Sequence, residues 1–82
     1  MPNRDQLKTA LSAAGSAHHD YESKFLKGVR DEMWPGWYAA FVIGCLGDFT
    51  TPTELTEWLI EVSFEGDWFE NAVELIAERL KK

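Results

Sequence analysis

The sequence predicts an all-α protein, a compact four-helix domain that occupies residues 1–82 as a single unit. Apolar residues recur at spacings of three and four in separate segments, which is the pattern of helices with one buried side. Capping signals precede several of these segments, and no stretch shows the period-two alternation of a half-buried strand. A chain of 82 residues has room for one core only, to which its eleven aromatic residues contribute.

The first helix is expected over residues 3–27. Asn3 can cap its start, and Gly28 can adopt the left-handed conformation that ends a helix. Gly15 in its middle weakens it by up to about 1 kcal/mol relative to alanine. One apolar stripe with spacings of four and three runs along it and comprises Leu7, Leu11, Ala14, His18, Tyr21 and Phe25.

The second helix is expected over residues 35–47, with Pro35 at its first position and Trp34 in the preceding loop. Almost every side chain from Trp37 to Leu46 is apolar. A helix without a polar side is normally central and covered on several sides, so we expect the second helix to be buried. Cys45 lies in this run and is therefore expected to be a buried thiol, with no partner for an internal disulfide.

The third and fourth helices are expected over residues 52–65 and 68–81. Thr51 precedes Pro52 and is followed three residues later by Glu54, the pattern of a capped helix start. Asp67 and Glu70 repeat this pattern after Gly66, which is expected to interrupt the helical conformation between the two helices.

The chain is acidic, and its basic residues are unevenly distributed along the sequence. Its net charge is −6, and no Lys or Arg occurs between Asp31 and Glu78. Such a surface repels phosphate, so neither nucleic acid nor a membrane is an expected partner. The longest uncharged run, residues 33–47, is shorter than the roughly 20 apolar residues of a membrane span. We therefore expect a cytoplasmic protein.

One cluster of side chains could orient a ligand. On a helix, His18 and Glu22 face the same way, and a short connection then reverses the chain. An imidazole, two carboxylates and aromatic groups should thus meet at one end of the domain. They form either the lining of a pocket or a hydrogen-bonded clamp between two helices, and both alternatives require His18 close to Asp31. The candidate ligand-binding residues are His18, Tyr21, Glu22, Asp31, Trp34 and Tyr38.

The motifs of metal, cofactor and nucleophile chemistry are missing from the sequence. Zinc usually takes three or four protein ligands, whereas the chain has two adjacent histidines and one cysteine in an apolar run. It contains no glycine-rich phosphate loop, nucleophile elbow or cysteine pair. We therefore expect no metal, no cofactor and no catalytic residue, and an autonomous enzyme is not expected.

One segment carries a resemblance. His18-x-x-Tyr21-Glu22, followed by Gly28-Val29-x-Asp31-x-x-Trp34-Pro35-x-Trp37-Tyr38-Ala39, resembles a segment of small uncharacterised bacterial helical proteins. The likeness covers about a quarter of the chain and implies no activity. It implies only that the first helix and the following loop form one unit.

Three functions remain open. The first is a protein–protein interaction module or subunit, either a homodimer or part of a hetero-assembly, which the aromatic surplus and the thin core favour. The second is a small-ligand-binding domain or enzyme component with a pocket between the first helix and residues 30–38. The third is an acidic antagonist of a basic, nucleic-acid-binding protein.

Overall fold

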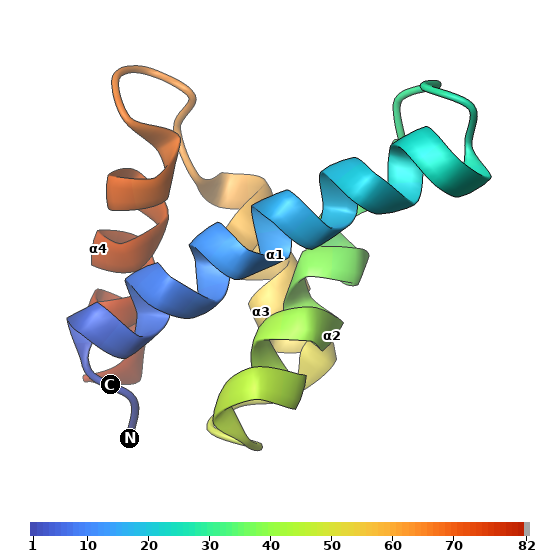
Figure 1. Cartoon of the computed structure of the whole chain (residues 1–82). Helices are drawn as coiled ribbons and strands as arrows, with labels where there is room; N and C mark the ends of the chain where they lie inside the picture. Colours follow the sequence, from blue (N-terminus) through green and yellow to red (C-terminus); the bar gives the residue numbers. More distant parts are fainter. Residues whose placement is uncertain (82) are drawn as a thin grey trace.

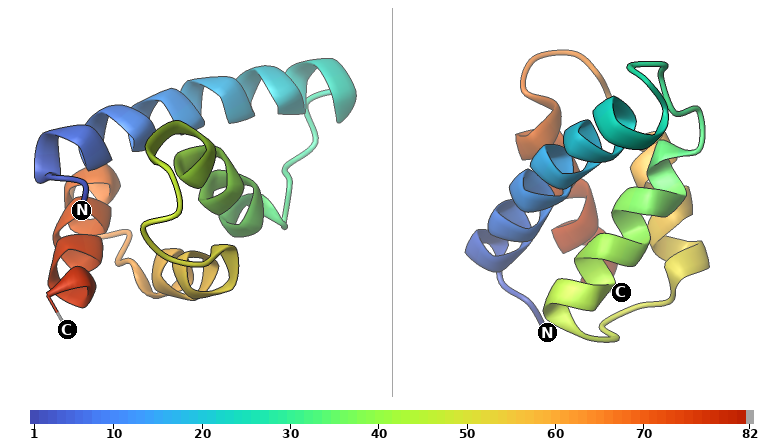
Figure 2. Two further views of the ribbon diagram at one scale, coloured as in Figure 1. Left: turned by 90° about the horizontal axis from the view of Figure 1, so that it is seen from below. Right: turned by 45° about the vertical axis from the view of Figure 1, so that its right-hand side comes forward.

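The computed structural model describes residues 1–81 and confirms the all-α, four-helix fold. Its helices are α1 (Arg4–Phe25), α2 (Trp34–Leu46), α3 (Pro52–Glu61) and α4 (Trp68–Leu80). The longest helix, α1, runs as a bar across the other three (Figure 1), and its C-terminal turns extend beyond them. The chain then returns through residues 26–33 to the start of α2 (Figure 2).

Three helix starts are capped by the side chains that the sequence predicts. Asn3 Oδ1 accepts a hydrogen bond from the Gln6 amide at 2.8 Å, and Gln6 Oε1 accepts one from the Asn3 amide at 2.9 Å. Thr51 Oγ1 accepts from the Glu54 amide at 3.1 Å. Asp67 Oδ1 accepts from two amides in the first turn of α4. These bonds satisfy amides that have no partner inside the helix.

The end of α3 differs from the prediction by four residues, because the helix stops at Glu61 and not at residue 65. Val62 leaves the helix in an extended conformation and is buried in the core at 5% exposure. Asn71 Nδ2 on α4 then donates hydrogen bonds to the Ser63 and Glu65 carbonyls at 3.0 and 2.7 Å. Tertiary contacts thus replace the last helical turn.

The core lies where α1 crosses the other helices. Gly15 has a packing role there, since a Cβ on it would lie 3.1 Å from Cζ of Phe69 on α4. The buried hydrophobic residues are Leu7, Ala10, Leu11, Ala14, Ala39, Val42, Leu55, Leu59, Val62, Ala72, Val73 and Ile76.

A smaller part of the α2 surface is buried than predicted. The helix packs against both α1 and α3, as a central helix should, and buries Pro35, Ala39 and Val42. On its other side Ala40 and Cys45 are exposed to solvent, so the expectation of a buried Cys45 thiol was wrong. The physical reason is that an apolar helix carries no polar side to mark which face meets water.

Candidate functional site

His18 and Asp31 lie close together, as both readings of the predicted cluster require. His18 is 5% exposed, and its Nε2 lies 2.9 Å from Asp31 Oδ2. On the opposite edge of the ring, Nδ1 lies 3.7 Å from Glu22 Oε1, one helical turn further along α1. The imidazole is therefore enclosed between two carboxylates.

Backbone hydrogen bonds fix Asp31 and Glu22 in this position. Glu22 Oε2 accepts from the Asp31 amide at 2.8 Å, and Asp31 Oδ1 accepts from the Met33 amide at 2.9 Å. The hydrogen bond with His18, followed by the one from Met33, lowers the pKa of Asp31 below its ordinary value. These bonds tie the connection between α1 and α2 to the end of α1.

Aromatic rings complete the surroundings of His18. The ring centroids of Trp37, Tyr38 and Tyr21 lie 5.0, 5.3 and 6.0 Å from the imidazole, and the first two meet it edge to face. Burial, followed by the charge of Glu22, raises the pKa of Tyr38 above its ordinary value. Trp37 was not among the predicted site residues, although it stands within the segment that carries the resemblance.

The six predicted residues divide into two groups. His18, Glu22 and Asp31 form the polar cluster, with Tyr21 beside them. Trp34 instead packs against Phe64 and Trp68, with ring centroids 6.3 and 5.4 Å away. Tyr38 joins the groups, because its ring contacts those of both His18 and Trp34. No sequence signal pointed to Phe64 or Trp68, which come from the α3–α4 connection and the start of α4.

A small hollow lies next to Trp34, with a volume of about 160 Å³. It faces α4 and not α1, so its position differs from the pocket predicted between the first helix and residues 30–38. Ligand pockets for drug-sized molecules are roughly 300–1,000 Å³, and this hollow admits only a small group. It is lined by Arg30, Trp34, Tyr38, Phe64, Trp68 and Phe69.

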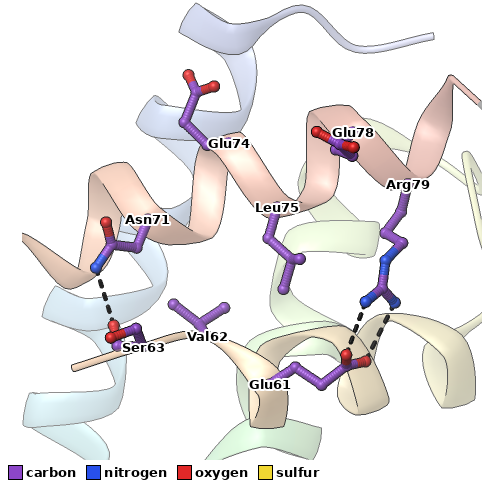
Figure 3. A pocket seen from close by; sticks show the side chains of 8 residues that line it. All are labelled: Glu61, Val62, Ser63, Asn71, Glu74, Leu75, Glu78 and Arg79. Atoms are coloured by element: carbon purple, nitrogen blue, oxygen red, sulfur yellow. Dashed lines mark hydrogen bonds and ion pairs between the residues drawn. The ribbon is translucent and has the colours of Figure 1, made fainter. Parts of the chain in front are cut away.

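A second hollow, of about 510 Å³, lies between α4 and the end of α3 (Figure 3). Arg79 crosses it and donates two hydrogen bonds to Glu61, at 3.1 and 2.7 Å. This contact lowers the pKa of Glu61 and raises that of Arg79. Glu74, also in the lining, is held by Arg4 at 2.9 and 3.0 Å. The fold thus brings arginines from both ends of the chain onto the acidic helices.

An uncharged surface covers the outward side of α2, which contains no charged residue. Trp37, Ala40, Phe41 and Gly44 follow the spacing of one helix side and form what we call the outer face of α2. Ala40 and Gly44 are exposed. Trp37 and Phe41 are half-buried and stack on each other, with ring centroids 5.6 Å apart.

The outer face continues onto α1 through ring contacts. Tyr21 lies 5.7 Å from Trp37 and 5.6 Å from Phe25, measured between ring centroids. Phe25 ends this row and is 72% exposed. Four aromatic rings therefore form a continuous apolar row from the end of α1 to the middle of α2.

Within residues 1–81, no group of three or more His, Cys, Asp or Glu side chains is arranged to hold a metal ion. None of the described helices combines the length and the apolar character needed to cross a membrane. No known protein family, curated protein or solved structure matches the chain.

Proposed function

We propose that this protein is a small protein–protein interaction module whose binding surface is the outer face of α2, extended by the aromatic row. The observation that carries the proposal is an uncharged helix side exposed to water on a chain of net charge −6. Protein interfaces are depleted of charge at their centres and enriched in Trp, Tyr and Phe, and the outer face has both properties.

The position of the exposed apolar residues supports this proposal. Phe25, Val29 and Met33 are 72%, 66% and 76% exposed and lie at or near the junction of α1 and α2. Single exposed apolar residues are common on monomers, but contiguous ones are rarer and mark contact surfaces. Of these three residues Phe25 belongs to a contiguous surface, because ring contacts join it to Phe41 through the aromatic row.

In this proposal the cluster around His18 is a clamp. It holds the last turns of α1 against the start of α2 and so keeps the aromatic row in one arrangement. The enclosure of the ring supports the clamp over a ligand site. His18 is buried, and it lines neither the hollow beside Trp34 nor another hollow, of about 640 Å³, that lies between α1, Tyr38 and Phe69. A ligand would have to displace a carboxylate to reach Nε2.

A small-ligand-binding domain is the second candidate, and the hollow beside Trp34 favours it. Arg30 at its rim and aromatic walls suit a small anionic group. A thermal-shift screen of small carboxylates and phosphates tests this candidate, because a ligand at a hundred times its Kd stabilises the folded state by about 2.7 kcal/mol. The acidic-antagonist hypothesis has less support, because Glu61 and Glu74 are already bound to arginines.

A matched pair of variants tests the interaction surface. Ala40→Glu places a carboxylate on the outer face of α2, whereas Ala13→Glu adds the same charge at an exposed position of α1. Each variant and the wild type would be used as bait in affinity purification from the native host, together with light scattering of the purified chain. We expect Ala40→Glu alone to lose association. Equal behaviour of the two variants would contradict the proposed surface.

A further inference from the structure

The outer face of α2 has an alternating shape that determines which partner fits it. Along the helix its side chains read large, small, large, small: Trp37, Ala40, Phe41 and Gly44. Ala40 is exposed, and a Cβ built on Gly44 would meet no atom within 4 Å, so both small positions are open. The face therefore has two aromatic ridges and two gaps.

Resting on the proposed function, we infer that the partner is a second copy of this chain, packed through α2 in an antiparallel, two-fold arrangement. A two-fold contact uses the same patch on both copies, so the patch must complement itself. Antiparallel pairing about the midpoint of the outer face places Trp37 opposite the gap at Gly44 and Phe41 opposite Ala40. Parallel pairing would instead place ridge against ridge and gap against gap.

Charge selects the same face. Each copy carries a net charge of −6, so the net electrostatic force between two copies is repulsive. The helix Trp34–Leu46 contains no charged residue, and its outer face is where two copies can meet without opposing carboxylates. Antiparallel packing also aligns the two helix dipoles favourably. A basic partner would find nothing to pair with on this face.

The size of the contact sets its strength. A fully buried aromatic side chain covers roughly 150–250 Å², and most of Trp37 and Phe41 is already covered within the monomer. Even with the exposed Phe25 side chain, the contact stays below the roughly 800 Å² per partner of a standard interface. We therefore expect a weak, reversible dimer that is populated at about 0.1 mM protein and above.

Sedimentation equilibrium over a concentration series tests the inference. We expect a monomer–dimer equilibrium that strengthens as NaCl rises to about 0.5 M, because salt screens the repulsion between acidic chains. Ala40→Glu should raise the dissociation constant at least about tenfold, since it buries like charges near the two-fold axis, while Ala13→Glu should leave it nearly unchanged. Gly44→Leu fills the gap opposite Trp37 and should weaken the dimer without a change of charge.

Disulfide trapping tests the antiparallel arrangement. Two cysteine variants are compared, Ala40→Cys and Gly44→Cys. Each also carries Cys45→Ser, which removes the exposed native thiol. In the Ala40→Cys variant, the cysteine of one copy lies near the cysteine of the other copy, close to the two-fold axis. The two should therefore cross-link under oxidation. In the Gly44→Cys variant, the two cysteines are about 10 Å apart along the antiparallel helices. This exceeds the roughly 7 Å Cα–Cα limit of a disulfide, so this variant should not cross-link. Efficient cross-linking through position 44 would overturn the antiparallel arrangement.

The two proposals fail in different ways. A purified chain that stays monomeric at about 1 mM in high salt overturns the second-copy inference. If the wild type and Ala13→Glu then retain a cellular protein that Ala40→Glu loses, the proposed function stands with a different partner. If the chain neither self-associates nor retains any protein through this face, both proposals are wrong.

Discussion

Replacing His18 by alanine is the most direct test of the clamp between α1 and the following connection. A hydrogen bond from a buried group to a charged acceptor contributes about 1.5–3 kcal/mol, and the His18 Nε2 bond to Asp31 is 2.9 Å long. The variant also loses the edge-to-face contacts with Trp37 and Tyr38, which contribute about 0.5–1.5 kcal/mol each where they are well formed. Because such contributions overlap, we expect a loss of about 3 kcal/mol in the free energy of unfolding.

Urea unfolding followed by tryptophan fluorescence measures this loss, because Trp37 lies beside the imidazole. The melting temperature should fall by roughly 12–24 °C for a domain of this size. His19→Ala is the matched control, since His19 is exposed on the same helix and should change stability by less than about 0.5 kcal/mol. His18→Phe keeps a ring without a donor and separates packing from hydrogen bonding. The clamp would be refuted if His18→Ala lost less than about 1 kcal/mol and could not be distinguished from the His19→Ala control.

Four further substitutions test other parts of the structure. Gly44→Ala should raise the free energy of unfolding by about 0.5–1 kcal/mol by urea denaturation, whereas Gly15→Ala should gain less because its Cβ meets Phe69 at 3.1 Å; an equal gain at both positions would contradict the packing at Gly15. Phe41→Ala should cost about 1–2.5 kcal/mol, below the 3–5 kcal/mol of a fully buried phenylalanine, because its ring is half-buried; a loss above about 4 kcal/mol would place it in the core. Asp31→Asn should flatten the acid limb of the stability curve. The folded-state pKa of Asp31 is lowered, so its ionised form stabilises the fold above the ordinary value of 3.8, and this contribution disappears as pH falls through the folded-state pKa. Acid titrations of variant and wild type that run parallel from pH ~5 to ~2 would contradict that assignment.

The candidate site was predictable in part because its first members are close in sequence. His18 and Glu22 are one helical turn apart, and a short connection brings Asp31 back to them, so chain length alone limits how far apart they can lie. Trp34 was predicted on the same grounds but turns to the other side of the connection, toward Trp68. Trp68 is distant from Trp34 in sequence, and no local sequence pattern predicts a contact between them.

The sequence by itself determined where the helices begin and which fold class they form. The caps at Asn3, Thr51 and Asp67 are bonds between residues two or three apart, so they depend on local chemistry alone. Apolar spacing likewise marks the stripe of α1 that is buried from Leu7 to His18, because polar residues on the other sides of the helix provide the contrast. Phe25, the last member of the predicted stripe, is exposed.

Only the tertiary structure decided how far α3 extends, which side of α2 meets water and which carboxylates are paired. Val62 leaves α3 because burial in the core stabilises it more than another helical turn would. Arg79 reaches Glu61 only when α4 packs beside α3. On α2 every side is apolar, so periodicity contains no information about orientation, and the neighbouring helices α1 and α3 select the covered side. The exposed outer face of α2 is therefore a property of the packing and not of the local sequence.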